Sequence, residues 1–304
     1  MKNKYIFTAV MLCAIMFAGT LLTGLYVRHE QRSTKHMHSS GARQFRVVTS
    51  FYPMYIAAKN IIGDCDGVTL ENLSEPQTGC LHDYQLTTQD MVKLSSADVF
   101  IVNGGGIESF LADVAAQYPA LTIIEASADV QLIEDNAHAW MSIPDYMTQV
   151  STIAQGLSGQ NAVHEEYYEK NCQEYLSRLD TLRQRQQELA AAHRGRSIVI
   201  FHEAFDYIAR DCGFRVSAVL DLDEERQVSA GEAADLLRHI REDHADLILA
   251  EERYGKRMCE SIQKEETVKA VYLDTCVRGD YTADSYLNAM EENLEKLEEA
   301  LESV

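Results

Sequence analysis

The feature of this 304-residue chain that most constrains its fold is a repeated alternation of short β-rich runs with helical patterns. Each of two sets contains four strand-like runs, at residues 45–50, 68–73, 98–104 and 121–126 and at residues 197–201, 214–220, 245–251 and 268–274. Strands separated by helices pair in parallel, because the chain must cross over the sheet between them. The sequence therefore predicts the α/β fold class, with two similar lobes that are each built on a mostly parallel sheet.

A long charged stretch without proline or glycine separates the two sets. Residues 162–193 carry apolar side chains at helical spacing, and about 32 residues at 1.5 Å each would make a rod about 48 Å long. The apolar stripe is too irregular for the sustained heptads of a coiled coil. We therefore predict an N-terminal lobe at 45–160, one long rigid bridging helix at 161–194, and a C-terminal lobe at 195–304.

The N-terminus carries a different signal, because residues 5–27 are 23 consecutive positions without a charge. A secretory h-region usually has 7–15 residues, whereas about 20 residues are needed to span a bilayer. Residues 1–27 are therefore predicted to be a membrane anchor or signal segment, and the polar residues 28–44 a spacer. Basic residues flank the apolar segment on both sides, so the positive-inside rule leaves its orientation open.

The charge of the chain is strongly acidic and unevenly placed. The net charge is −20, but residues 1–46 hold seven basic side chains and one acidic, so residues 47–304 have a net charge of −26. Binding to nucleic acid is driven by a basic surface that releases counterions from phosphates, so nucleic acid is not expected as a partner. An acidic surface instead attracts cations.

Six cysteines follow the apolar segment, namely Cys65, Cys80, Cys172, Cys212, Cys259 and Cys276. None of them forms a C-x-x-C pair, so a zinc knuckle or thioredoxin-type site has no support. An even number beyond an export-type leader fits disulfides, and the pairs closest in sequence are Cys65 with Cys80 and Cys259 with Cys276. Ordinary buried thiols fit the sequence equally well.

Four residues that can bind a metal lie in or near the loops at the carboxyl ends of predicted strands, where α/β proteins build their sites. His82 lies in the loop after 68–73, His138 precedes a helical pattern, His202 directly follows a strand, and Asp274 ends one. Each alone is explained as a loop histidine, a core histidine or a helix cap. Together, three imidazoles and one carboxylate form the four-coordinate set that zinc prefers.

Motifs for catalysis are not found. The segment HEAFD at 202–206 is close to the zincin motif H-E-x-x-H, but that motif lies on a helix, whereas His202 follows a strand. The glycines of NGGGIES at 103–109 lack the continuation of a phosphate-binding loop, and no G-x-S-x-G elbow occurs. We therefore expect a binding protein rather than an enzyme, with a zinc-dependent hydrolase and a surface adhesin as alternatives from other classes.

Several motifs in order resemble the metal-binding solute receptors of bacterial zinc and manganese ABC transporters, over about residues 45–303. The matching segments are VVTSFYPMYIAAKNIIGD (47–64), HDYQLTTQDMVKLSSADVFIVNGGGIESF (82–110), HAWMSIP (138–144), FHEAFDYIARDCGF (201–214) and LILAEERYGKRMCESI (247–262). The resemblance implies two α/β lobes joined by a rigid helix, with a metal between them. It also implies His82, His138, His202 and Asp274 as ligands, two from each lobe.

The residue at the third ligand position indicates the metal. Manganese receptors of this family tend to have a carboxylate there and zinc receptors a histidine, so His202 places the chain in the zinc-type branch, and Mn²⁺ or a broad range of metals is the alternative. The adjacent Glu203 is a candidate acceptor for an imidazole N–H behind the ligands. The chain departs from many zinc receptors in having no histidine between His82 and His138.

The resemblance implies an extracytoplasmic receptor that binds Zn²⁺ with high affinity as its transported ligand and delivers it to an ABC-transporter permease in the membrane. We expect a monomer at the extracytoplasmic face of the cell membrane. It is N-terminally anchored there, or it is secreted or periplasmic if residues 1–27 are cleaved.

Overall fold

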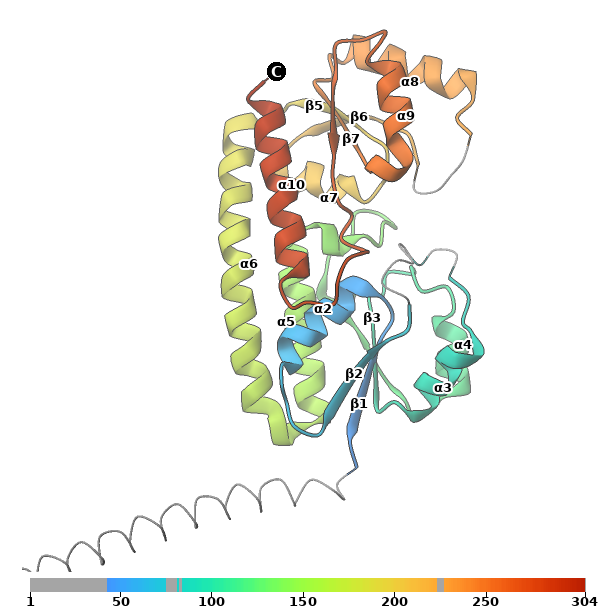
Figure 1. Cartoon of the computed structure of the whole chain (residues 1–304), viewed down its shortest axis with the longest axis vertical. Coiled ribbons are helices and arrows are strands. Elements are labelled where there is room, and N and C mark those ends of the chain that lie inside the picture. The colour runs from blue at the N-terminus through green and yellow to red at the C-terminus, as the bar shows by residue number, and fades with distance from the viewer. Residues whose placement is uncertain (1–42, 75–80, 82–83, 223–226, 304) are drawn as a thin grey trace, which may run out of the picture. The chain divides into compact units, whose positions relative to one another are not determined.

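The computed structural model describes residues 43–74, 81, 84–222 and 227–303. Residues Phe45–Val304 form one compact unit, which contains two four-stranded sheets whose strands all pair in parallel (Figure 1). The predicted α/β fold class, with two parallel-sheet lobes and a long helix, is therefore confirmed.

The first sheet has the strand order β2-β1-β3-β4. Its strands are β1 (Phe45–Thr49), β2 (Val68–Asn72), β3 (Val99–Val102) and β4 (Thr122–Glu125), and its helices are α2 (Tyr52–Ile62), α3 (Thr88–Ser96) and α4 (Leu111–Gln117). The strand β3 is buried along its whole length, as its unbroken apolar sequence requires. Helix α3 begins where Thr87 and Asp90 form a capping box, which satisfies two backbone N–H groups of the first turn.

The second sheet repeats this order as β6-β5-β7-β8. Its strands are β5 (Ser197–Ile200), β6 (Arg215–Val219), β7 (Leu247–Ala250) and β8 (Lys269–Tyr272), and its helices are α7 (Phe205–Cys212), α8 (Ala230–Glu242) and α9 (Glu252–Ile262). In both sheets the strand order reverses direction between the two central strands, β1 and β3 in one and β5 and β7 in the other. The carboxyl ends of these central strands are where open α/β sheets bind ligands.

Three long helices connect and cover the sheets, namely α5 (Ile143–Gln160), α6 (Glu165–His193) and α10 (Ser285–Leu301). Helix α6 has 29 residues, which corresponds to about 44 Å, and it leads from the first lobe to β5 (Figure 1). It begins four residues later than the predicted 161, because a 3₁₀ turn at Ala162–His164 follows α5. For helix α5 the sequence indicated only a helical pattern after His138, without bounds.

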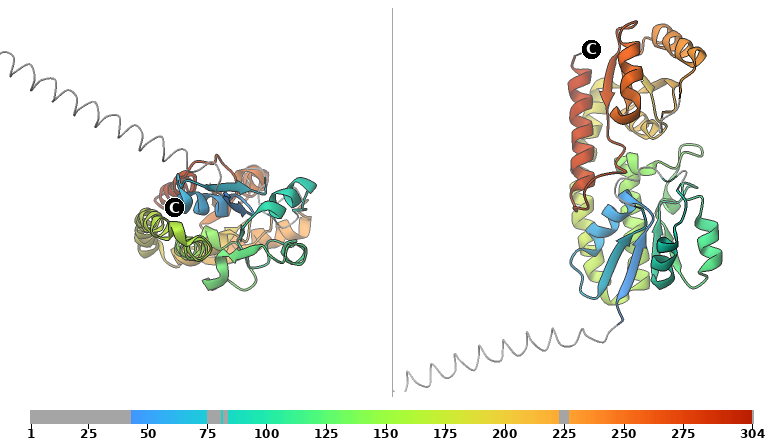
Figure 2. Two further views of the ribbon diagram at one scale, coloured as in Figure 1. Left: turned by 90° about the horizontal axis from the view of Figure 1, so that it is seen from below. Right: turned by 45° about the vertical axis from the view of Figure 1, so that its right-hand side comes forward.

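Helix α10 lies beside α6 and runs in the same direction (Figures 1 and 2). Arg178 near the middle of α6 pairs with Asp284 at 2.6 Å, and Arg185, two turns later, pairs with Glu298 at 2.6 Å. Because α10 begins beside the first lobe and ends beside the second, the C-terminal helix follows the bridging helix along both lobes.

The five cysteines in the described part of the chain, Cys65, Cys172, Cys212, Cys259 and Cys276, are free thiols. Cys259 and Cys276, one of the two candidate pairs, therefore do not form a disulfide, and the alternative of ordinary buried thiols holds for both. Cys259 packs into a smaller cluster of the second lobe around β7 and α9, whereas Cys276 packs into the larger core, which includes residues of both sheets and of α5, α6 and α10. The alternative partner Cys80 lies outside the described residues.

In the described part of the chain, no helix is both long and apolar enough to cross a membrane. The predicted membrane segment and spacer, residues 1–44, lie outside it except for the last two positions.

Candidate metal centre

Two of the predicted ligands, His138 and His202, lie against each other where the lobes meet. His138 precedes the 3₁₀ turn Ala139–Met141 of the first lobe, and His202 is the second residue after β5. Their exposed fractions are 0% and 1%. The ring centroids are 5.0 Å apart and the ring planes are nearly perpendicular, at 83°. The structure thus brings one imidazole from each lobe to a single buried position.

The imidazole of His138 is oriented by Asn136. The Nδ1 atom of His138 lies 2.8 Å from Oδ1 of Asn136, which also accepts the backbone N–H of His138 at 3.0 Å. An amide oxygen only accepts hydrogen bonds, so Nδ1 carries the proton and Nε2 keeps its lone pair. Nε2 is therefore the nitrogen of His138 that can bind a metal.

His202 has the opposite arrangement. The backbone N–H of Ala204 donates to Nδ1 of His202 at 2.9 Å. A backbone N–H is only a donor, so Nδ1 is unprotonated and Nε2 carries the proton of the neutral ring. If His202 coordinates through Nε2, its proton has to move to Nδ1. A protonated Nδ1 cannot accept the N–H of Ala204, so that hydrogen bond has to break.

Glu203 connects the two lobes beside these rings. Its Oε1 lies 3.4 Å from Nδ1 of His138, and its backbone carbonyl accepts from the Asn136 side chain at 2.8 Å. Its side chain is 43% exposed. The carboxylate of Glu203 can therefore accept the Nδ1–H of His138 that Asn136 also accepts, while the bond from Asn136 to the Glu203 carbonyl stays in place.

Asp274 lies at the carboxyl end of β8, and its carboxylate contacts its own turn rather than either described histidine. Oδ1 accepts the backbone N–H of Cys276 at 2.6 Å. The residue is solvent-exposed, but partial desolvation by the surrounding protein raises the pKa of its carboxyl, against the lowering effect of the Cys276 N–H. The next residue, Thr275, accepts the indole N–H of Trp140 at 2.9 Å, and that indole ring lies 5.0 Å from the His138 ring.

The fourth predicted ligand, His82, lies outside the described residues, as does Cys80. Within the described ranges, no group of three His, Cys, Asp or Glu side chains is arranged to hold a metal ion. The histidine pair is consequently the part of the predicted ligand set that the structure places together.

Comparison with known proteins identifies the family. Residues 47–300 match the family described as zinc-uptake complex component A, periplasmic. The chain belongs to this family. Its members are solute-binding receptors and not enzymes, as the sequence predicted, and the hydrolase alternative is therefore wrong.

Relatives in and around the family are similar over most of their length. The high-affinity zinc uptake system protein ZnuA of Bacillus subtilis (strain 168) is 25% identical over 295 residues, covering 88% of this chain and 91% of that protein. The iron-binding protein YfeA of Yersinia pestis is 24% identical over 278 residues, covering 87% and 86%. The structure of FpvC from P. aeruginosa in complex with Ni²⁺ has a TM-score of 0.77 and 26% identity, covering 86% of this chain and 98% of that one. The chain is thus a metal-binding receptor of the zinc-uptake family, whose relatives are named for different metals.

Sequence reasoning missed the side chains that tie the receptor's two lobes together around the histidines. The hydroxyl of Tyr207 donates to the carbonyl of Asn136 at 2.6 Å. Arg210 donates to Asp145 at 2.7 Å and to Ser142 at 2.8 Å. A usable signal for Asn136 was its position two residues before a candidate ligand, since short polar side chains often bond the backbone two residues on.

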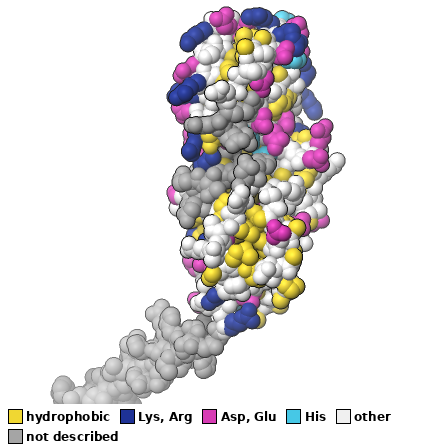
Figure 3. Space-filling model, turned by 90° about the vertical axis from the view of Figure 1, so that its right-hand side faces the viewer, with side chains coloured by type: hydrophobic (Ala, Val, Ile, Leu, Met, Phe, Trp, Pro, Cys, Tyr) yellow, Lys and Arg dark blue, Asp and Glu magenta, His cyan; other side chains and the backbone are white. Residues whose placement is uncertain are grey.

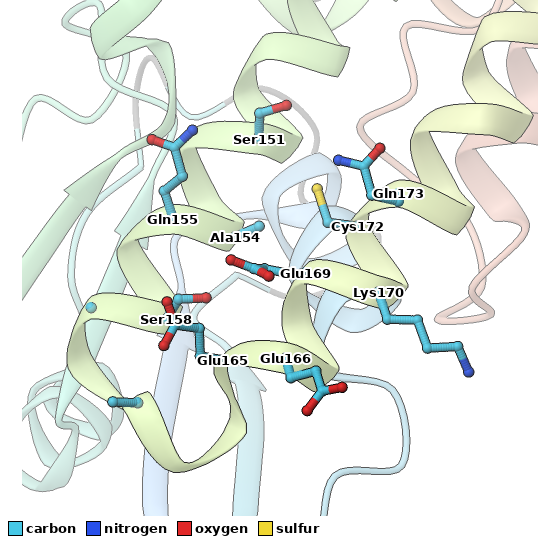
Figure 4. Close-up of a pocket in the computed structure, with 12 residues that line it drawn as sticks. Ser151, Ala154, Gln155, Ser158, Glu165, Glu166, Glu169, Lys170, Cys172 and Gln173 are labelled. Carbon is cyan, nitrogen blue, oxygen red and sulfur yellow. The ribbon is translucent and has the colours of Figure 1, made fainter.

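A groove elsewhere on the receptor has a volume of about 870 Å³ and lies between α5 and α6 (Figure 4). Its polar lining includes Ser158 on α5 and Glu165, Glu166 and Glu169 on α6, and none of the predicted ligands lines it. The surface view gives a second contrast: on the face shown in Figure 3, hydrophobic side chains gather on the first lobe and charged side chains on the second. Val92 on α3 is 64% exposed. Neither feature contributes to the histidine pair.

Proposed function

We propose that the protein is an extracytoplasmic receptor that captures Zn²⁺ between its two lobes and delivers it to the permease of an ABC transporter. The observation that carries this proposal is the buried pair of His138 and His202, one from each lobe, with ring centroids 5.0 Å apart. A metal bound to both rings would hold the lobes together, and its departure would leave only the direct contacts between them.

The proposed ligands are His82, His138, His202 and Asp274, with Glu203 as an acceptor behind His138. A zinc ion held by four protein ligands has no open position for an activated water, so such a site binds metal without catalysing a reaction. This set supplies three nitrogens and one oxygen. Imidazole suits zinc, whereas Mn²⁺ prefers carboxylates, carbonyls and water.

A broad-range receptor is the second candidate, supported by the iron and nickel in the names of the relatives. A histidine pair does not separate Zn²⁺ from Ni²⁺ or Fe²⁺ by ligand type, because all of them bind imidazole. The zinc proposal therefore depends on the fourth ligand and on the geometry that the bound state adopts.

The remaining parts of the proposal concern the whole chain. Residues 1–27 would hold the protein at the outer face of the membrane or direct its export, and 28–44 would separate it from the bilayer. Residues 45–160 and 195–304 would act as the two lobes around a bridging segment at 161–194, and the receptor would work as a monomer.

The test is metal content and affinity. The protein is purified without added metal and analysed by mass spectrometry, and Zn²⁺, Mn²⁺, Fe²⁺ and Ni²⁺ are then titrated into the metal-free form. We expect one zinc per chain and tightest binding of zinc, with a loss of affinity as the pH falls below about 6.5, because a protonated imidazole cannot coordinate.

Variants assign the ligands. His138→Ala and His202→Ala should each weaken zinc binding by about 100-fold or more, exceeding the roughly 10–100-fold effect of residues behind a ligand. Asp274→Ala should weaken it less than His202→Ala, because water or Glu203 can supply an oxygen. His239→Ala, which removes a partly exposed imidazole on α8, is the matched control. Unchanged zinc binding in His202→Ala, or tighter binding of manganese than zinc by the unaltered protein, would refute the zinc site as proposed.

A further inference from the structure

The segment between β8 and α10, residues 274–284, crosses from the second lobe to the surface of the first (Figure 1). We call it the strap. Its far end is bonded to α2: the side chain of Asn60 donates to the carbonyl of Ala283 at 2.8 Å, and the Tyr52 hydroxyl donates to the carbonyl of Asp280. Two residues of the strap, Asp280 and Ala283, are therefore bonded to the first lobe, whereas the strap begins in the second.

Tyr281 of the strap contacts both α2 and the end of β2. Its ring centroid lies 4.4 Å from that of Tyr55 and 5.7 Å from that of Tyr52. Its hydroxyl donates to the carbonyl of Ser74 and accepts from the side chain of Asn72, both at 3.2 Å. Asn72 is the last residue of β2, the edge strand of the first sheet. Tyr281 thus holds the carboxyl end of β2 against the strap.

The end of β2 is also held from the other side. The ammonium of Lys93 on α3 donates to the carbonyl of Asn72 at 2.8 Å, and the side chain of Asn72 accepts from Thr49 at 2.7 Å. An edge strand leaves one row of backbone groups without a neighbouring strand, and at the end of β2 the Lys93 ammonium satisfies the carbonyl of Asn72. Thr49 and Lys93 therefore hold the end of β2 in place.

The near end of the strap is equally constrained. Cys276 has a φ of 56°, which is uncommon for a residue other than glycine, and its N–H is bonded to Asp274. The hydroxyl of Thr275 donates to Glu251 at 2.7 Å. At Gly279, with a φ of 151°, a Cβ atom would collide with the Tyr52 hydroxyl. The strap is therefore a fixed connection between Asp274 and the first lobe.

We propose that Tyr281 is a positioning residue for metal binding: through the strap it couples the turn of Asp274 in the second lobe to the end of β2 in the first. The inference rests on the proposed function, since Asp274 at the near end of the strap is a proposed ligand of the second lobe and His138 is a proposed ligand of the first. With the Tyr281 hydroxyl in place, ligands contributed by the two lobes are held in one arrangement. Without it, the end of β2 loses its bond to the strap and the metal leaves faster.

The test compares Tyr281→Phe with the unaltered protein and with Tyr118→Phe in the full chain. Tyr118→Phe is the matched control, because its hydroxyl also donates to a backbone carbonyl of the first lobe, that of Met91 at 2.8 Å, away from the strap. Zinc dissociation is followed by stopped flow with an excess of chelator, and affinity by competition with a chromophoric chelator. The absorption bands of bound Co²⁺ report the coordination geometry, which a loss of stability alone does not change.

We expect Tyr281→Phe to speed zinc dissociation about tenfold, within the range for residues behind a metal ligand, and to alter the Co²⁺ bands. Tyr118→Phe should leave both within twofold of the unaltered protein. Equal dissociation rates in the two variants, or unchanged Co²⁺ bands in Tyr281→Phe, would overturn the positioning role while zinc binding by the unaltered protein still supports the receptor. If the unaltered protein binds none of the tested metals, the proposed function fails first and the inference fails with it.

Discussion

The two lobes have the same strand order but fill the ends of their central strands differently. In the first lobe, the carboxylate of Glu108 lies at the ends of β1 and β3, where it accepts the Ser50 hydroxyl at 2.8 Å and the backbone N–H groups of Asn103 and Gly104 at 2.7 and 3.1 Å. In the second lobe, the end of β5 carries His202, whose ring faces the other lobe. One lobe closes this position with a buried carboxylate, and the other presents an imidazole there.

This difference explains why the first lobe places its histidine elsewhere. With the ends of β1 and β3 occupied by Glu108, the ligand comes from the segment after β4, where His138 lies. Asn103 connects the two features, because its side chain donates to the carbonyl of Ala137 at 2.9 Å and accepts from Gln149 at 2.8 Å. The closed strand ends thus become the support on which the histidine-bearing loop rests.

The largest expected effect is on stability in the first lobe. Glu108→Ala removes the acceptor of the Ser50, Asn103 and Gly104 donors, and each buried group without a partner costs about 1–3 kcal/mol. We expect the free energy of unfolding of the metal-free protein to fall by about 3–5 kcal/mol in urea. His202→Ala removes no such acceptor set and should lower it by about 1–2 kcal/mol. Similar losses in the two variants would contradict the distinction between a structural and a ligand-bearing strand end.

A smaller effect is expected from Asn136→Ala, which keeps both histidines but removes the acceptor that fixes the proton of His138 on Nδ1. The ring would then populate both tautomers and more orientations, so zinc affinity should fall by about 10–100-fold. Asn161→Ala, at the end of α5, removes a side-chain amide that donates to Tyr168 far from the pair and serves as the control. Isothermal titration at one pH measures both variants. Equal zinc affinities would show that Glu203 alone orients His138.

Much of the fold could be predicted because its signals are local. All eight strands in the described part of the chain lie within the predicted runs, since short apolar runs between helical patterns leave few other structures available. The bounds of helix α5 were not predicted, although it has start signals, Ser142 as N-cap and Pro144 in its first turn. Its sequence mixes glycines and β-branched residues that favour other structures, and packing on α6 overrides that preference.

The site was predictable only as far as strand ends determine it. The rule for carboxyl ends of strands selected His138 and His202 before their proximity was known. The bonds that join the lobes, from Tyr207 to Asn136 and from Arg210 to Asp145, depend on how the lobes face each other. Sequence periodicity carries no information on that orientation. The candidate Cys259–Cys276 pair failed for the same reason. The two residues are close in sequence, but β8 lies between them and they pack into different clusters.

The smallest expected effect is the pH dependence of the buried carboxylate, which tests the comparison from its electrostatic side. Burial raises the pKa of Glu108, although hydrogen bonds from Ser50, Asn103 and Gly104 oppose the shift. A raised folded-state pKa means that the native state binds this proton more tightly than the unfolded chain does. The resulting stabilisation is fully present below the ordinary glutamate pKa of about 4.3 and is lost as the pH rises through the folded-state value.

Relative to Glu108→Gln, which does not titrate, the metal-free protein should therefore lose stability as the pH is raised from about 4 to 8. Urea unfolding of both proteins at each pH measures the difference, in which the histidines common to both cancel. If the unaltered protein instead gained stability relative to Glu108→Gln as the pH was raised, the three donors would outweigh desolvation. The strand ends of the first lobe would then hold a permanent anion.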